Sequence, residues 1–165
     1  MAIIMQNLIK QAHLRLLKSG KTIATAESCT AGLLSALLTQ LPDSSRYFIL
    51  GITSYSNRAK QSVLRIPASI IRRRGAVSKE TALLMAQNIR KLAKADLGVS
   101  ITGIAGPGGG TLRKPVGTVF IALSSKNKSS CNKFIFKGNR NSVRNQAALK
   151  ALQLLSQIKG TVLFS

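Results

Sequence analysis

The segment around Ser28 holds the residues of this sequence that are best suited to chemistry. It reads Ala26-Glu27-Ser28-Cys29-Thr30-Ala31-Gly32 and joins a strand-like run to a helix-forming run. Backbone amides near Cys29 and Thr30 are expected to point at whatever occupies the start of that helix, where the helix dipole favours negative charge. Ser28 is therefore a candidate nucleophile for acyl transfer. The structural alternative is a plain helix cap, a role for which serine is among the preferred residues.

A serine nucleophile needs a base, and the chain offers few. The single histidine, His13, lies in a separate predicted helix and is expected to be a surface or boundary residue. Cys29 is an alternative nucleophile, but it too needs a basic partner to form a thiolate. A lysine can serve as the base once its pKa, ordinarily about 10.4, falls by roughly three units, or about 4 kcal/mol. Lys60 is the candidate base, and the positive charge of nearby Arg58 is expected to help lower its pKa. Tyr55 is close enough in sequence to relay a proton or fix the amine. The structural alternative for this pair is a tyrosine at a strand end and a lysine on a helix surface.

A glycine-rich stretch and two arginines are candidates for holding a phosphate. The stretch Gly103–Gly110 follows a predicted strand that ends at Thr102, and glycines let backbone amides approach a phosphate closely. It lacks the Gly-Lys-Ser or Gly-Lys-Thr ending of an ATP-binding P-loop, so a plain tight connection stays open. Arg140 and Arg144 begin the last predicted helix and can clamp a phosphate, or lie on a solvated helix face.

The composition predicts one soluble domain with an unusual charge. The 165 residues, 45% of them hydrophobic, suffice for one core, and no apolar run approaches the roughly 18 residues of a membrane span. The chain begins without a signal-peptide pattern and has only two cysteines, so we expect a cytoplasmic protein without disulfides. Its one histidine, two cysteines and four acids are dispersed and do not make a metal-ligand set.

Lys and Arg number 25 against four acids, which gives a net charge of +21. Such a field attracts nucleotides, nucleic acid and acidic lipid surfaces without choosing among them. Apart from Arg72-Arg73-Arg74, the cations are scattered along the sequence with few aromatics between them. A basic solvated surface is therefore the plain alternative to a nucleic-acid interface.

Hydrophobic patterns predict the elements that must position these residues. Strands are expected over 21–26, 47–55, 97–102, 116–123 and 131–136, and helices over 3–19, 31–38, 79–95 and 141–158, with two short helices after 56 and after 67. This order implies an α/β domain with helices covering a mixed sheet, because crossovers join parallel neighbours while the last two strands form an antiparallel hairpin. Ligands of such sheets bind at the carboxyl ends of strands, where three candidate segments lie: Ser28, Tyr55 with Lys60, and the glycine-rich stretch after Thr102.

Five sequence blocks also occur in a fixed order along the chain. They are Thr25–Gly32, Tyr55–Asn57 with Ala59–Lys60, Gly75–Ser78, Thr102–Pro107 and Lys114–Val119. Together they closely resemble the CinA family, and in particular its stand-alone nicotinamide-nucleotide amidases, which are similar to the C-terminal domain of competence/damage-inducible CinA proteins. The resemblance implies one domain over residues 1–165. It also implies a three-layer α/β/α fold of the anticodon-binding kind, with a mixed, mostly parallel sheet of about five strands.

The resemblance implies hydrolysis of the carboxamide of nicotinamide mononucleotide to nicotinate mononucleotide and ammonia, a step in pyridine-nucleotide salvage, without a metal or other cofactor. Carried over by position, Ser28 is the nucleophile, Lys60 the general base and Tyr55 its partner near the leaving group. By position, Glu27 is also implied to hold the serine turn, and Arg140 or Arg144 to meet the phosphate. The residues implied to line the nucleotide are Cys29, Thr30, Thr102, Gly103 and Gly106.

The chain departs from the family pattern before its last helix. The usual Gly-Asp-Arg is Gly138-Asn139-Arg140 here, so a carboxylate that could orient the arginine or cap the helix is missing, although Asn139 can still cap. We find no counterpart of the N-terminal nucleotide-hydrolysing domain of full-length CinA proteins and expect no pyrophosphatase activity. Two other functions stay open: a basic nucleic-acid-associated protein whose site has decayed, and an amidase of the same fold for a different nucleotide amide. A homo-oligomer also stays open.

Overall fold

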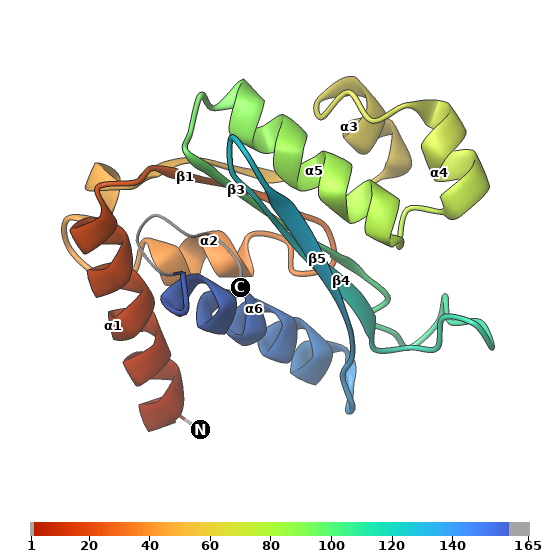
Figure 1. Ribbon diagram of the computed structural model, residues 1–165. Helices are drawn as coiled ribbons and strands as arrows, with labels where there is room; N and C mark the ends of the chain where they lie inside the picture. The colour runs from red at the N-terminus through yellow and green to blue at the C-terminus, as the bar shows by residue number, and fades with distance from the viewer. Residues whose placement is uncertain (1, 159–165) are drawn as a thin grey trace.

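A five-stranded sheet, with its strands in the order β2-β1-β3-β4-β5, forms the middle layer of the fold (Figure 1). The computed structural model describes residues 2–158. Its strands are β1 (Ile23–Glu27), β2 (Phe48–Thr53), β3 (Leu97–Gly103), β4 (Thr118–Ser124) and β5 (Ser129–Ile135). β1 pairs in parallel with β2 and β3, whereas β4 pairs antiparallel with β3 and β5. All strands except β4 therefore run in one direction, as predicted for a mixed, mostly parallel sheet.

Helices cover both faces of this sheet. They are α1 (Ala2–Ser19), α2 (Leu33–Leu38), α3 (Asn57–Ser62), α4 (Ala68–Arg74), α5 (Lys79–Leu92) and α6 (Arg140–Ser156), with a 3-10 turn η1 (Ser44–Arg46). Figure 1 shows α1, α2 and α6 on one side of the sheet and α3, α4 and α5 on the other. The predicted order of elements and the three-layer α/β/α arrangement are confirmed. Within residues 2–158, no helix combines the length and the apolar character needed to span a membrane.

Each helical layer packs on the sheet through its own apolar core, because successive side chains of a strand point to opposite faces. Ile23 belongs to the core shared with α1, α2 and α6, while Ala24 belongs to the core shared with α5. α5 lies directly on the backbone of β3: a Cβ added to Gly98 would lie 2.0 Å from the carbonyl oxygen of Ala86. Glycine is thus required there by close packing of a helix on a strand.

Side chains cap the starts of two helices. Ser78 Oγ accepts a hydrogen bond from the amide of Thr81 at 3.2 Å where α5 begins. Asn139 Oδ1 accepts one from the amide of Ser142 at 2.9 Å where α6 begins, so the prediction that asparagine still caps this helix is confirmed. These side chains satisfy backbone amides that have no partner inside the helix.

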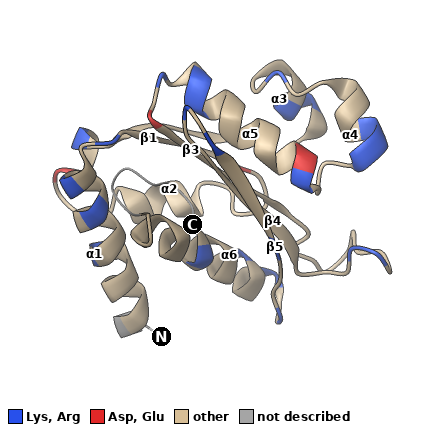
Figure 2. Ribbon diagram, viewed as in Figure 1, with Lys and Arg blue, Asp and Glu red and all other residues tan. Residues whose placement is uncertain are grey.

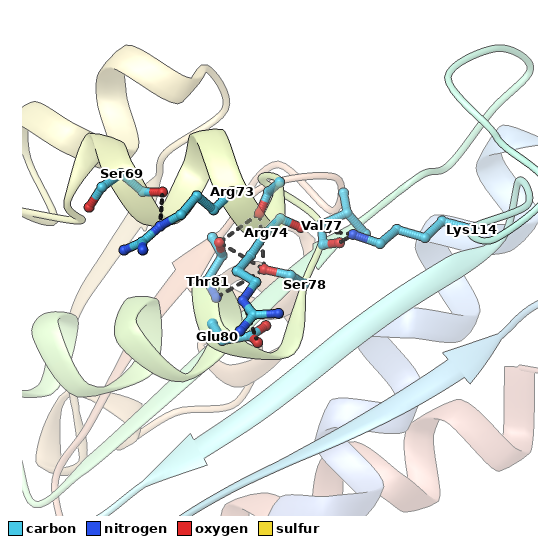
Figure 3. Close-up of polar contacts among 9 residues, drawn as sticks. Ser69, Arg73, Arg74, Val77, Ser78, Glu80, Thr81 and Lys114 are labelled. Carbon is cyan, nitrogen blue, oxygen red and sulfur yellow. Dashed lines mark hydrogen bonds and ion pairs between the residues drawn. The ribbon is translucent and has the colours of Figure 1, made fainter.

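A polar junction ties the start of α5 to α4 and to the segment that follows the glycine-rich stretch (Figure 3). Lys114 Nζ donates hydrogen bonds to the carbonyls of Arg74 and Val77 at 2.9 and 2.7 Å. Beside it, Arg74 and Glu80 form an ion pair at 3.3 Å, and Ser78 Oγ lies 3.0 Å from Thr81 Oγ1. The connection between β3 and β4 is therefore fastened to the α4–α5 layer at Lys114, shortly before β4 begins.

The parallel pairing of β1 with β2 and β3 brings three chain segments to one edge of the sheet. The turn that leads into α2 follows β1, the segment that leads into α3 follows β2, and the glycine-rich stretch follows β3. The carboxyl ends of parallel strands meet at the same edge, which is the usual ligand-binding edge of an open α/β sheet. This topology brings the predicted site segments together.

Candidate active site

Ser28 is the first residue after β1 and stays tied to the sheet. Its amide donates to the carbonyl of Ile101 at 2.9 Å, and the preceding carbonyl, of Glu27, accepts from the amide of Ser54 at 2.8 Å. Because side chains alternate along an extended chain, Glu27 contacts α2 and Ser28 faces the opposite layer, where α3 carries Lys60. Ser28 is 8% exposed, so it lies just below the surface.

The carboxylate of Glu27, and not the hydroxyl of Ser28, satisfies the start of the next helix. Fully buried, it accepts hydrogen bonds from the amides of Gly32, Leu34 and Ser35 at 3.1, 3.1 and 2.8 Å, and from Ser35 Oγ at 2.7 Å. The alternative that Ser28 is a plain cap is therefore wrong. Glu27 holds the serine turn from the α2 side, which is the place expected for it from the sequence.

Lys60 is buried against Ser28. Its Nζ donates to Ser28 Oγ at 2.9 Å, to the carbonyl of Ser54 at 2.7 Å and to the carbonyl of Tyr55 at 3.1 Å. The residue is 1% exposed, so the alternative of a helix-surface lysine is wrong. Burial lowers the pKa of Lys60 from 10.5 to about 8, because the charged amine is disfavoured away from water. Arg58, which we expected to contribute to this shift, is exposed to solvent.

Tyr55 contacts Lys60 through its main chain alone. Its side chain is largely exposed, and its hydroxyl accepts a hydrogen bond from Arg140 Nη2 at 2.7 Å. The expected hydroxyl contact with the lysine is absent between these two described residues, because the chain turns from β2 into α3 here and the ring leaves the sheet on the solvent side. Tyr55 therefore fixes the amine by its carbonyl and the arginine by its hydroxyl.

Two arginines of α6 reach the same edge of the sheet. Arg140 is exposed and donates from Nη1 to the carbonyl of Gly106 at 2.8 Å, so it bridges the glycine-rich stretch and Tyr55. Arg144 lies one turn later, is half-buried, and donates from Nη2 to the carbonyl of Thr30 at 3.1 Å. Neither side chain is confined to a solvated helix face, since each is bound to a loop of the site.

Cys29 and Thr30 complete the turn after the serine. Cys29 is buried in the core beneath α6, and burial raises the pKa of its thiol to about 11. A thiolate is therefore strongly disfavoured at neutral pH, which weakens Cys29 as the alternative nucleophile. Thr30 is fully buried, and its Oγ1 has no hydrogen-bond partner within the described chain.

Thr102 and its neighbouring glycines are occupied by packing. Thr102 is 1% exposed and donates its hydroxyl to the carbonyl of Ala76 at 2.8 Å. A Cβ added to Gly103 would lie 2.6 Å from the side chain of Val119, so glycine there reflects a close approach within the sheet. Gly106 has a φ of 84° and offers its carbonyl to Arg140. Of these three residues, Gly106 is the one that contacts another candidate site residue.

Ser54 is a site residue that sequence reasoning missed. It is fully buried, its carbonyl accepts from Lys60, and its Oγ has no partner among residues 2–158. Thr30 Oγ1, in the turn after Ser28, and Arg144 Nε, on α6, are also buried without partners in that range. Unpaired buried polar atoms are rare in folded proteins, so each of these three atoms marks a place that water or a ligand completes. The signal in the sequence was the position of Ser54 at a predicted strand end.

The arrangement provides a hydroxyl bonded to a buried amine of lowered pKa, which is the geometry of a serine nucleophile with a lysine base. Across residues 2–158, no three His, Cys, Asp or Glu side chains lie close enough together to hold a metal ion.

Comparison with known proteins gives a consistent family. The sequence model of the CinA C-terminal domain matches residues 5–159. A putative competence-damage inducible protein of Desulforudis audaxviator is 52% identical over 129 residues, which cover 78% of this chain and 31% of that protein. A CinA-like protein of Desulfotalea psychrophila is 49% identical over 151 residues, which cover 92% of this chain and 36% of that protein. The chain thus spans about a third of the length of these relatives.

Solved structures agree with the sequence comparison. The competence damage-inducible protein A from Klebsiella pneumoniae superposes with a TM-score of 0.89 at 32% identity, covering 93% of this chain and 95% of that one. A CinA superfamily protein from Escherichia coli gives a TM-score of 0.88 at 33% identity, covering 92% and 89%. On sequence and on structure alike, this chain belongs to the CinA C-terminal domain family.

Proposed function

We propose that this chain hydrolyses the carboxamide of nicotinamide mononucleotide to nicotinate mononucleotide and ammonia. The single observation that carries the proposal is the 2.9 Å hydrogen bond between Lys60 Nζ and Ser28 Oγ, with burial lowering the pKa of Lys60 to about 8. An amine with that pKa is neutral in a substantial fraction near physiological pH and can accept the serine proton. Membership of the CinA C-terminal domain family, which is linked to this activity, supports the choice of substrate.

In the acylation step, neutral Lys60 takes the proton of Ser28 as Oγ attacks the carboxamide carbon. The amide of Thr30 has no acceptor within the described residues and lies in the serine turn, where it is available to the developing oxyanion. The C–N bond then breaks, and the ammonium of Lys60 returns its proton to the departing nitrogen, which leaves as ammonia. Ser28 is left as an ester of the nicotinate group.

In the deacylation step, Lys60 takes a proton from water as the water oxygen attacks the ester carbon. The ester C–O bond breaks, the proton returns to Ser28 Oγ, and nicotinate mononucleotide is released. Three fixed acceptors hold the amine in reach of both reactions: Ser28 Oγ and the carbonyls of Ser54 and Tyr55. The proton passes directly between Lys60 and the reacting groups, since the hydroxyl of Tyr55 is bonded to Arg140.

Arg140 is the residue we assign to the substrate phosphate. It is exposed and stands between the glycine-rich stretch and Tyr55, whereas Arg144 is half-buried and braces the carbonyl of Thr30. A planar guanidinium on the solvent side can meet a phosphate with two parallel hydrogen bonds. Arg140→Gln should therefore raise KM for nicotinamide mononucleotide and leave activity toward nicotinamide riboside almost unchanged.

The wider context of this activity is also a proposal. We propose a single amidase domain over residues 1–165, of which residues 1 and 159–165 lie outside the described part of the chain. Both cysteines are free thiols, which fits action in the reducing cytoplasm. The alternative of a nucleic-acid-associated protein with a decayed site is less well supported, because the serine and lysine remain paired at hydrogen-bond distance.

Ammonia release by the purified protein with nicotinamide mononucleotide is the direct test. Ser28→Ala should abolish turnover, while Cys29→Ala, its neighbour with a thiol of raised pKa, should retain most of it. Full turnover by Ser28→Ala would remove the serine from the mechanism. Absence of ammonia release from the wild-type protein with this nucleotide, but release with another pyridine carboxamide, would move the proposal to a different amide on the same site.

A further inference from the structure

Ser54 lies beside the candidate nucleophile on the same face of the sheet. Its amide donates to the carbonyl of Glu27 at 2.8 Å, so the parallel pairing of β1 with β2 continues to this residue. Two positions earlier on the two strands, Ala26 and Ile52 both pack in the apolar core shared with α4 and α5. Because side chains alternate along a strand, Ser28 and Ser54 face this same layer, which also contains α3.

The hydroxyl is the part of Ser54 that has no partner inside the protein. The residue is fully buried, and its Oγ has no hydrogen-bond partner among residues 2–158, whereas its carbonyl accepts from Lys60 Nζ at 2.7 Å. On the other side of Ser28, the hydroxyl of Thr102 donates to the carbonyl of Ala76 at 2.8 Å. A buried hydroxyl is rarely left unpaired, so that of Ser54 is expected to bind water or a ligand.

The amine beside this hydroxyl has defined partners. Lys60 Nζ donates to Ser28 Oγ and to the carbonyls of Ser54 and Tyr55. An ammonium has three hydrogens, whereas the neutral amine has two hydrogens and a lone pair. In the acyl-enzyme, Ser28 Oγ is an ester oxygen, so the two carbonyls hold the two hydrogens and the lone pair is free to accept a proton. The amine can therefore bind one hydrogen of an attacking water but not the second.

The carboxylates of the chain are all placed elsewhere. The chain has four acids. Glu27 accepts from the start of α2, Asp43 precedes η1, Glu80 is paired with Arg74, and Asp96 is held by the segment before β1. Figure 2 shows that α3, the helix of the candidate base, has basic segments. Activation of the water thus depends on the lysine, and its orientation depends on a neutral group.

We propose that Ser54 is a positioning residue for deacylation, whose hydroxyl accepts one hydrogen of the attacking water while neutral Lys60 accepts the other. The inference rests on the acyl-enzyme of the proposed function. Held through both hydrogens, the water keeps a lone pair for the ester carbon on Ser28.

The protons of this step balance without a transfer through Ser54. As the water oxygen bonds to the ester carbon, one water proton passes to Lys60. The ester C–O bond then breaks, and this proton passes from Lys60 to Ser28 Oγ. The second hydrogen of the water stays on the carboxylic acid of the product, which ionises in solution. Ser54 keeps its own proton throughout, and acylation does not require its hydroxyl.

Burst kinetics with p-nitrophenyl acetate separate the two steps, because acylation releases p-nitrophenolate before water is needed. Ser54→Ala should retain a burst of about one p-nitrophenolate per active site, with a rate constant within about twofold of wild type, while the steady-state rate falls about tenfold. Ser28→Ala gives the background. The matched control Ser100→Ala removes the hydroxyl of an equally buried serine on the same sheet face, which donates to the carbonyl of Ala82, and should leave both phases unchanged.

Rescue separates positioning from a structural role. Ser54→Thr keeps the hydroxyl and should restore the steady-state rate to within about threefold of wild type. Hydroxylamine is a strong nucleophile that attacks an acyl-enzyme without a bound base, so it should raise turnover by Ser54→Ala to that of Ser100→Ala. Equal losses of burst rate and steady-state rate in Ser54→Ala, or a steady-state rate equal to that of wild type, would overturn the positioning role.

Measurement of ammonia release alongside the ester keeps the two proposals apart. The expected ester kinetics, with no ammonia from nicotinamide mononucleotide, would overturn the amide substrate and support the role of Ser54. Ammonia release by the wild type, with unchanged turnover and no accumulated acyl-enzyme by intact mass spectrometry in Ser54→Ala, would overturn the role of Ser54 alone. A wild type that shows neither a burst nor ammonia release would overturn both.

Discussion

Raising the pH from 7 to 9 should increase kcat/KM for nicotinamide mononucleotide about tenfold and then bring it to a plateau, because the base is the neutral form of Lys60. Burial lowers the pKa of Lys60 from 10.5 to about 8. With that value, roughly 9% of the enzyme carries a neutral lysine at pH 7, about half at pH 8 and about 91% at pH 9. A lysine with an ordinary pKa would be neutral in only ~0.03% of molecules at pH 7, and the rate would rise about a hundredfold over the same interval without levelling off.

The assay is ammonia release at substrate concentrations well below KM, in buffers of constant ionic strength, so that the profile reports the free enzyme. Lys60→Met should be inactive across the whole range. Lys79→Met makes the same substitution on an exposed residue at the start of α5 and should reproduce the wild-type profile.

A hundredfold rise with no plateau would show that the lysine is not shifted in solution, and the link between burial and basicity would be wrong. A profile that is flat from pH 7 to 9, or substantial activity in Lys60→Met, would assign the base to another group.

Three further outcomes are expected from the same geometry. Glu27→Gln should lower the free energy of unfolding by about 2 to 3 kcal/mol in urea denaturation, because the amide nitrogen of glutamine would face backbone N–H donors. The control Glu80→Gln, at a half-exposed residue, should lower it by less than about 1 kcal/mol. Equal effects of the two substitutions would contradict the role of the Glu27 carboxylate. Tyr55→Phe should raise KM several-fold with little change in kcat, since the hydroxyl orients Arg140, and a collapse of kcat at constant KM would restore the proton relay. Between pH 8 and 10.5 the wild type should gain up to about 3 kcal/mol of stability relative to Lys60→Met, because the pKa of Lys60 is lower in the folded protein than in the unfolded chain, which therefore binds more protons in that window. Denaturation of both proteins at pH 8 and pH 10 measures this change. A difference in stability that stays constant between the two pH values would refute it.

Much of the fold could be predicted because its elements carry strong local signals. Alternating and helical patterns of apolar residues mark the order of helices and strands. Boundaries shifted where tertiary pairing decides them: the strands of the last hairpin extend to Ser124 and Ser129, whose hydroxyls bond to each other. On α6 the buried positions include Ala148 and Leu152, which the helical pattern alone does not single out.

The candidate site could be predicted as a set of segments but not as a set of contacts. Parallel topology alone brings the ends of β1, β2 and β3 together. Which way a side chain points at those ends depends on residues distant in sequence, as with the hydroxyl of Tyr55 on Arg140. Carbonyl acceptors such as that of Ser54 leave no trace in residue types.

The opposite orientations of Glu27 and Ser28 make chain length in this segment as important as residue type. Deleting or inserting one residue in β1 would exchange the two side chains, placing a carboxylate beside Lys60 and a hydroxyl under α2. Library design on this scaffold should therefore vary residues around Ser28 at constant length. Length changes belong in the glycine-rich connection between β3 and β4, where Leu112 is fully exposed and the chain is fastened again at Lys114.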